Sequence, residues 1–377
     1  MYCASVEKLD LSNLSAYDQG CNEEFQHAMK NYFDGKASLD DAEIDYIELG
    51  GAVPNPRLSL VYEGIGLAKK EGVDFILAVG GGSAIDSAKA IGYGVANEGD
   101  VWDFYDRKRT PQSCMPIGCV LTIAAAGSEM SNSSVITKEE GLIKRGCNSD
   151  VCRAKFAILN PELTMTLPPY QTSSGCADIM MHTMERYFNQ SENMDITDSI
   201  AEGLMKTVKK HAVILMTEPD NYESRAEVMW ASSLSHNGIT SCGTDGGDWA
   251  THKMEHELGG MFDCAHGAGL AAIWASWARY VYKANMNRWL QYASNVWGLD
   301  IDFEHPEKTI ETAIDMQEQY YASIGMPIGL KELGVKEDDL AKLALDCSRN
   351  KTRSLIGYKP LAYEDILVIY QMAYERG

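Results

Sequence analysis

The sequence changes character at Leu167-Pro168-Pro169, and this change limits the folds open to the chain. Before the prolines, from about Ile44, short runs rich in Val and Ile alternate with segments of helical periodicity. Such alternation is typical of a mostly parallel sheet with helices on its faces. After the prolines, long segments of helical periodicity follow one another as far as Tyr374. We therefore predict an α/β domain over residues 1–168 and an all-helical domain over residues 169–377.

The same patterns predict individual strands and helices. The predicted strands are Ile44–Leu49, Val73–Val79, Pro116–Thr122 and Phe156–Leu159. The predicted helices are Leu58–Glu71, one that starts near Ala84, Gln171–Asn189, Ile196–Thr217, Arg225–His236, Gly247–Leu258 and Ala268–Tyr282.

Four of the eight histidines lie in two short segments of the predicted helical domain. In the segment WATHKMEHELGGMFDCAHGAG, His252 and His256 are four residues apart, which places them on the same face of a helix. Upstream, Asp178 and His182 have the same spacing. A single histidine is more often a surface or core residue than a ligand. Two such pairs together predict a functional site.

A further histidine, His266, follows Gly259-Gly260, where we expect the chain to turn and bring this side chain back toward the preceding helix. Three or four ligands of the imidazole and carboxylate type, with one position left open, suit divalent first-row metals. The pattern therefore predicts a metal centre that can accept a substrate.

A glycine-rich segment, Gly80-Gly81-Gly82-Ser83, follows an apolar run and opens a predicted helix. Glycines let the backbone approach a phosphate, and a helix N-terminus offers free N–H groups. The same pattern also forms tight turns that bind nothing. The sequence thus indicates either a phosphate-binding turn or a turn without a ligand.

Charge and cysteine usage limit the partners and the compartment. The net charge of −21 disfavours nucleic acid and anionic membranes as partners. The ten cysteines show no paired spacing such as Cys-x-x-Cys, as expected of reduced thiols in the cytoplasm. No signal peptide is evident, and the longest apolar run, Ala268–Ala278, is too short to span a bilayer. We expect a cytoplasmic enzyme.

Several longer segments resemble the iron-dependent (group III) alcohol dehydrogenase family, especially its butanol dehydrogenase-like branch. They are ELGGAVPNPR, ILAVGGGSAIDSAKAI, LTIAAAGSEMSNSSVIT and FAILNPELTMTLPP, and the resemblance runs from about Glu48 to the C-terminus. It implies the dehydroquinate synthase-like/iron-dependent alcohol dehydrogenase fold, a Rossmann-like parallel-sheet domain followed by an all-α domain. It also implies hydride transfer between a primary alcohol or aldehyde, butanol- or butanal-like, and NAD or NADP.

The same resemblance implies roles for individual residues. The metal, Fe²⁺ or else Zn²⁺, is expected on Asp178, His182, His252 and His266. His256 matches a catalytic histidine beside the reacting carbon that does not bind metal, and it could relay a proton. The residues expected to bind the nicotinamide dinucleotide are Gly80, Gly81, Gly82, Ser83, Asp86, Thr122, Ser128 and Lys155, with Lys89 on the same element as Asp86. A homodimer is the expected assembly.

Two departures from the family pattern keep other functions open. Residues 1–41 lack the hairpin, strand and second glycine turn with which the family begins, and Ala126 stands where the family usually has Thr. These departures predict a weak hold on the adenosine end, and they leave open a catalytically weak or inactive relative with a structural or regulatory role. A metal-dependent hydrolase or lyase is a third possibility. Trp249 and Phe262 are candidates either for an apolar alcohol pocket or for the core.

Overall fold

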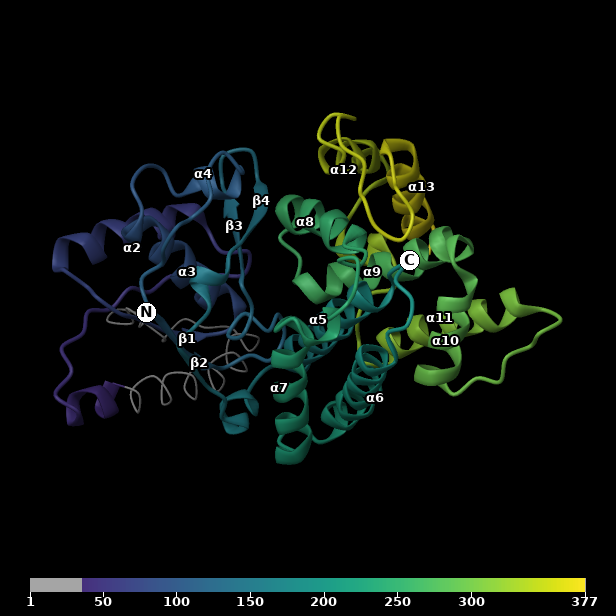
Figure 1. Cartoon of the computed structure of the whole chain (residues 1–377), viewed down its shortest axis with the longest axis horizontal. Coiled ribbons are helices and arrows are strands. Elements are labelled where there is room, and N and C mark those ends of the chain that lie inside the picture. The colour runs from purple at the N-terminus through teal and green to yellow at the C-terminus, as the bar shows by residue number, and fades with distance from the viewer. Residues whose placement is uncertain (1–35, 377) are drawn as a thin grey trace, which may run out of the picture.

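The computed structural model describes residues 36–376, which form an α/β half and a helical half (Figure 1). The α/β half contains α2 (Leu58–Glu71), β1 (Ile76–Gly80), α3 (Gly82–Ala96), α4 (Trp102–Tyr105), β2 (Ile117–Leu121), β3 (Ser133–Lys138), β4 (Ile143–Asn148) and β5 (Phe156–Ile158). The helical half contains α5 (Pro169–Tyr187), α6 (Asp195–Thr217), α7 (Tyr222–His236), α8 (Ala250–Phe262), α9 (His266–Val281), α10 (Met286–Trp297), α11 (Pro306–Ser323), α12 (Leu340–Cys347) and α13 (Tyr363–Tyr374). The predicted α/β-plus-all-α fold class is confirmed.

The α/β half is built on a parallel sheet with the strand order β1-β2-β5. Ile76 of β1 is paired with Ile117 of β2, and Gly118 of β2 with Phe156 of β5. Helix α3 follows β1 directly, contacts it and buries Ile85, Ala88 and Ile91, and the Gly80–Ser83 turn lies at the carboxyl end of β1. This is where a parallel α/β sheet places its ligand sites.

The predicted strand Ile44–Leu49 is reduced to an isolated bridge at Glu48 within residues 36–376. The segment forms no strand element, and Ile44 and Ile47 are 52% and 39% exposed. A strand needs a hydrogen-bonded neighbour on at least one side, and among residues 36–376 the only strand paired with β1 is β2.

A hairpin that the sequence analysis did not predict, β3–β4, projects from the sheet toward α8 (Figure 1). Its two strands are antiparallel, with Val135 opposite Gly146 and Ile136 opposite Arg145. Strand β4 reads IKRGCN and most of its residues are only partly buried, so it lacks the apolar alternation on which strand prediction depends.

Helices α5 and α9 form the centre of the helical half. From Thr172 to Tyr187 every residue of α5 is buried, and α9 is buried from Gly267 to Ala278. A helix that is buried all round needs neighbours on every side; α5 contacts α6, α7 and α9, while α9 contacts α8, α11 and α13. Side chains on α5 therefore reach the interior of the domain. Within residues 36–376, no helix combines the length and apolar character needed to cross a membrane.

The expected chain turn at Gly259-Gly260 is wrong, because α8 continues through both glycines to Phe262. The turn comes at Asp263, which has left-handed backbone angles (φ 51°). A Cβ atom on Gly260 would lie 2.7 Å from the carbonyl oxygen of Leu142, and one on Gly259 would lie 3.0 Å from Lys144 Nζ. These glycines are therefore required for the close approach of the β3–β4 hairpin to α8.

Replacing Gly260 with Ala tests this explanation. The methyl group must displace the backbone at Leu142, so we expect a loss of stability of about 1–3 kcal/mol, as for overpacked cores. The matched control is Gly203→Ala on α6, where a Cβ would meet nothing within 4 Å and should stabilise the helix by up to about 1 kcal/mol. Denaturant unfolding of both variants measures the difference. Equal stability of the two would contradict the packing argument.

Candidate metal centre and cofactor turn

Helix α5 carries the first two predicted ligands, Asp178 and His182, one turn apart. Their side chains are buried, at 2% and 3% exposure. His182 Nδ1 lies 3.2 Å from Asp178 Oδ1. Because α5 lies at the centre of the domain, these groups are held in the interior, where ionisable side chains are costly unless they are paired.

Two further histidines approach Asp178 from neighbouring helices. His252 is on α8, and His266 is the first residue of α9, just after the turn at Asp263. Their Nε2 atoms lie 3.6 Å and 3.7 Å from Asp178 Oδ1. One ligand atom from each of Asp178, His252 and His266 lies within 4.8 Å of the others. The structure thus brings together three of the four predicted ligands, and His182 adjoins them with its ring centroid 4.5 Å from that of His252.

The donor atoms fit a divalent ion. Asp178 Oδ1 and His252 Nε2 are enclosed and form no hydrogen bond within residues 36–376. Two ligands that bind one tetrahedral ion at about 2.1 Å are roughly 3.4 Å apart, close to the observed 3.6 Å and 3.7 Å separations. One carboxylate with imidazoles suits Fe²⁺ or Zn²⁺.

Two carboxylates behind the histidines orient their rings. Glu185 Oε2 lies 2.6 Å from His252 Nδ1, and Glu185 Oε1 accepts a hydrogen bond from the backbone N–H of His252. Glu255 contacts Nδ1 of His266 and forms a 3.2 Å ion pair with Lys144 of β4. Each carboxylate thus lies on the Nδ1 side of its ring, while Nε2 of each ring lies toward Asp178.

Neither of these carboxylates was predicted as a site residue, although the sequence contains a signal for each. Glu185 follows Asp178 at i+7 and His182 at i+3, on the same helix face, and Glu255 follows His252 at i+3. Lys144 gave no such signal, since it lies on a hairpin more than a hundred residues from Glu255 and His266 in the sequence.

The carboxylates change the pKa values of their neighbours. Burial lowers the pKa of His252, but Glu185 and Asp178 outweigh this effect and raise it to about 9. Burial raises the pKa of Glu255, but His266 and Lys144 outweigh it and hold the value well below its usual range. For His182, burial and the neighbouring His236 and His252 lower the pKa well below its ordinary value.

His256, the predicted catalytic histidine, lies one helical turn after His252 and outside the three-residue metal group. Its ring centroid is 6.1 Å from that of His266, and burial together with Lys144 lowers its pKa well below the ordinary value. Trp249 has its ring 5.4 Å from His252 and stacks against Arg186, so it contacts the metal group. Phe262 packs against the core.

The predicted cofactor turn has its glycines where close packing demands them. Gly80 has a φ of +149°, and a Cβ there would lie 2.8 Å from Ala84. A Cβ on Gly81, the N-cap of α3, would lie 3.0 Å from Ile123. The glycines thus have a structural reason apart from any ligand. The N–H groups of Gly82 and Ser83, the first two residues of α3, nevertheless lack partners within the helix and can bind an anion, whereas that of Ala84 donates to the carbonyl of Gly81.

Most of the other predicted cofactor residues hold the loop after β2 against α3. Asp86 accepts hydrogen bonds from the hydroxyl of Ser128 and the backbone N–H of Val135. Lys89 is fully buried and donates to the carbonyl oxygens of Ser128, Ser131 and Ser133. Thr122 is tied through its backbone N–H to the carbonyl of Gly80.

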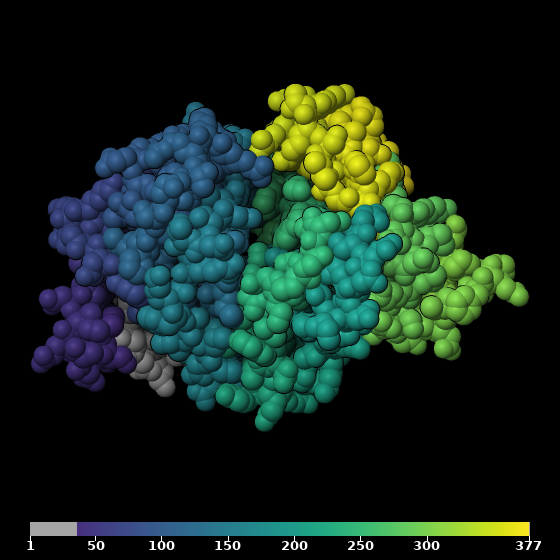
Figure 2. Space-filling model, viewed as in Figure 1, coloured from purple at the N-terminus to yellow at the C-terminus, as the bar shows by residue number. Residues whose placement is uncertain are grey.

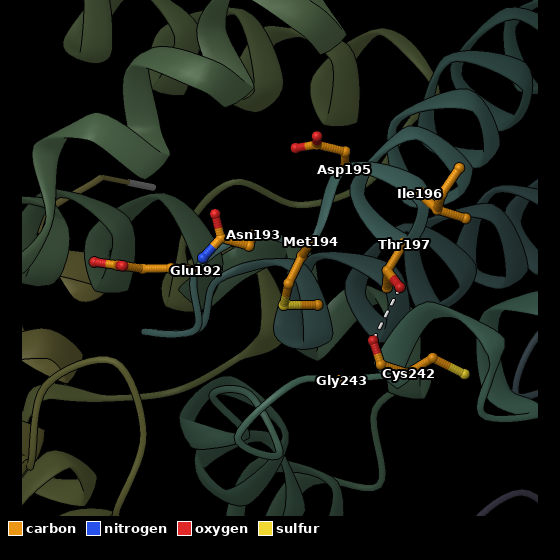
Figure 3. A pocket seen from close by; sticks show the side chains of 8 residues that line it. All are labelled: Glu192, Asn193, Met194, Asp195, Ile196, Thr197, Cys242 and Gly243. Carbon is orange, nitrogen blue, oxygen red and sulfur yellow. Dashed lines mark hydrogen bonds between the residues drawn. The ribbon is translucent and has the colours of Figure 1, made fainter.

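Lys155 takes no part in these contacts between α3 and the loop after β2. It lines a pocket of about 530 Å³ together with Glu129, Arg153, Trp230 and Asn237. The lysine that the structure places beside the metal group is Lys144. A second, smaller pocket of about 290 Å³ lies where α6 begins (Figure 3). Its lining includes Glu192, Asp195 and Cys242 and none of the predicted site residues.

Comparisons with known proteins decide the family. The model of the iron-containing alcohol dehydrogenases matches residues 21–161, and the model of the C-terminal part of the Fe-containing alcohol dehydrogenase family matches residues 172–374. The chain belongs to the iron-containing alcohol dehydrogenase family.

Individual relatives agree with this family. NADH-dependent butanol dehydrogenase A of Clostridium acetobutylicum is 40% identical over 339 residues, which cover 90% of this chain and 87% of the relative. The crystal structure of NADH-dependent butanol dehydrogenase A from Thermotoga maritima superposes with a TM-score of 0.88 at 36% identity, covering 92% of this chain and 89% of that one. A structure of Escherichia coli YqhD gives a TM-score of 0.87 at 30% identity, covering 92% and 89%.

This family membership confirms what the sequence predicted about the enzyme class. The chain is an alcohol dehydrogenase or aldehyde reductase of the iron-containing type, with a metal and a nicotinamide dinucleotide as its cofactors. Figure 2 shows a groove between the α/β half and the helical half.

The carboxylate behind His252 gives a testable consequence. Glu185→Gln removes the charge that orients this ring, and it should weaken metal retention about tenfold, within the usual range for such partners. The matched control is Glu202→Gln on α6, a buried glutamate that accepts from Tyr187 and contacts none of the ligands. Residual metal after dialysis against graded chelator is the measurement. If the two variants hold metal equally well, Glu185 does not orient His252.

Proposed function

We propose that this enzyme reduces a short-chain aldehyde such as butanal, or oxidises the corresponding primary alcohol, with NADH or NAD as the hydride partner. The proposed metal ligands are Asp178, His182, His252 and His266. The observation that carries the proposal is the convergence of Asp178 Oδ1 with the Nε2 atoms of His252 and His266. Four relatives at 36–40% identity are named as established or probable NADH-dependent butanol dehydrogenases, which supports this substrate class and NADH.

Each part of the site has a distinct task in this proposal. A bound divalent ion supplies a Lewis acid for the substrate oxygen. Glu185 and Glu255 keep the two histidine rings in the orientation that frees Nε2. His256 holds or accepts the proton of the substrate hydroxyl, since a neutral imidazole can act as a base. The N-terminus of α3 binds the pyrophosphate of the dinucleotide, and Asp86, Thr122, Ser128 and Lys155 are the further proposed cofactor residues.

Three broader assignments complete the proposal. The domain boundary is placed at Pro168-Pro169, where α5 begins, giving domains 1–168 and 169–377. A cytoplasmic location is supported by eight cysteines that are free thiols in residues 36–376. The homodimer rests on the family resemblance.

The second candidate function is a catalytically weak or inactive relative. One observation from the sequence favours it: residues 1–41 lack the hairpin, strand and second glycine turn with which the family begins. Residues 1–35, which include most of the segment that lacks the family's first strand, lie outside the described part. Turnover by the purified protein separates the two candidates.

The test begins with the wild-type chain. Purified protein loaded with Fe²⁺ under anaerobic conditions, or with Zn²⁺, should oxidise NADH in the presence of butanal, and chelation should abolish the rate until metal is restored. His266→Ala should lose metal and activity together, because it removes one of the three convergent ligand atoms. Full metal occupancy and normal turnover in His266→Ala would refute the ligand assignment. Metal binding without turnover in the wild type would favour the inactive relative.

His256→Ala supplies the contrasting case on the same helix face. This residue lies outside the convergent group, so the variant should retain its metal and lose mainly turnover, by about 10²- to 10⁴-fold for a missing acid–base group. Metal analysis and single-turnover kinetics on the same preparation give both quantities. Metal loss as large as that of His266→Ala would show that His256 is a ligand and not a proton relay.

A further inference from the structure

A fifth histidine, His236, lies beside the metal group although it belongs to none of the motifs above. It is the last residue of α7 and is partly exposed. Its ring centroid is 4.1 Å from that of His182 and 6.0 Å from that of Trp249. His236 thus packs against the proposed metal group from the side that faces the α/β half.

The other contacts of His236 are to the loop that follows β2. Its Nδ1 is 2.9 Å from the carbonyl oxygen of Ala126. A carbonyl oxygen only accepts hydrogen bonds, so Nδ1 carries the hydrogen and donates it. This bond joins the helical half to the position at which the sequence departs from the family, where Ala replaces the usual Thr.

The same loop, residues 124–129, is held to α7 at further points. Ser232 donates to the carbonyl of Ala125, and Ser233 donates to Glu129. Gly127 has a φ of +61°, and a Cβ there would lie 2.5 Å from the carbonyl of Ser232 and 2.9 Å from the Cβ of His236. The loop therefore lies directly on α7, in a conformation that no side chain at position 127 would permit.

This loop also forms one wall of the glycine turn. A Cβ on Gly82 would lie 3.3 Å from Ala126, and one on Gly81 would lie 3.0 Å from Ile123. A shift of the loop by a few tenths of an ångström would therefore change the shape of the turn. His236 is the residue that contacts both this wall and the ring of His182.

We propose that His236 is a positioning residue, which fixes the loop 124–129, and through it the cofactor turn, at a set place relative to His182. The proposal rests on the proposed function, since it concerns binding of the dinucleotide at this turn. The decisive contact is the Nδ1–H to Ala126 hydrogen bond. The ring itself is not assigned to the metal or to the reacting atoms.

Two substitutions separate the hydrogen bond from the bulk of the ring. His236→Leu keeps an apolar side chain of moderate size but has no donor. His236→Asn places an amide N–H near the position of Nδ1 and can still donate to Ala126. For His236→Leu we expect NADH affinity to fall about fivefold, as for the loss of one hydrogen bond, with KM for NADH raised more than kcat is lowered. His236→Asn should restore most of the affinity, and both should keep full metal content.

Calorimetric titration with NADH, metal analysis and hydrogen exchange at residues 124–131 give the readouts. The matched control is His211→Leu, a histidine on α6 that bonds Ser224 and should leave all three unchanged. Wild-type NADH affinity in His236→Leu, or an Asn variant as weak as the Leu variant, would overturn the proposal. So would metal loss in His236→Leu, because the ring would then support the metal group itself. If the wild type binds no NADH, the proposed function fails, while faster exchange at residues 124–131 in His236→Leu but not in His236→Asn would still support the loop contact.

Discussion

The buried carboxylate of Asp178 is the constraint on which the rest of the site depends. An ionised carboxylate in a protein interior is costly unless other charges or hydrogen bonds compensate it. Here Oδ1 has no hydrogen bond within residues 36–376 and is surrounded by three histidines at 3.2–3.7 Å. Such proximity requires close helix packing. A Cβ on Gly267, next to His266, would collide with the carbonyl oxygen of Ser174 on α5. The small residue after the ligand therefore allows α9 to begin against α5.

The charges around the ligands explain why a cation suits this position. Asp178, Glu185 and Glu255 are each at most 2% exposed. Within residues 36–376, Lys144 adds a positive charge beside Glu255 and His266, and Arg186 adds one at the backbone carbonyl of His182. Carboxylates in excess over cationic side chains leave negative charge enclosed in a region of low dielectric. Protonation of His252 relieves part of this charge, as its raised pKa indicates. A divalent ion would relieve it with the rings neutral, which is why metal affinity at such sites depends on pH.

Local periodicity in the sequence predicted most helices and strands of this structure well. Features that depend on contacts between distant segments were predicted poorly. Helix α2 has the bounds expected from its sequence, and Asp178, His182 and His252 lie where their i,i+4 spacing implies. The errors arose where neighbours decide the conformation. Ile44–Leu49 forms only an isolated bridge at Glu48 within the described residues, and Gly259-Gly260 stays helical where the β3–β4 hairpin packs on it. His236 and Lys144 could not be recognised, since their partners are separated from them by more than a hundred residues.

The two halves are joined by contacts of two kinds, and the difference bears on hydride transfer. On the α7 side the loop 124–129 is held by hydrogen bonds from Ser232, Ser233 and His236 and by a glycine that permits backbone contact. Beyond the end of α8, the half-exposed Asp263 accepts hydrogen bonds from Asn55 and Arg57 of the α/β half. Exposed ion pairs contribute little and are readily broken, whereas packed backbone contacts cannot slide without strain. Packed backbone contact also occurs beside α8, where Gly260 lies against the carbonyl of Leu142. The α7 side is the one that adjoins both the glycine turn and His182. Hydride transfer requires the reacting carbons to be held about 3–3.5 Å apart. The contacts best able to set that distance are those between α7 and the loop.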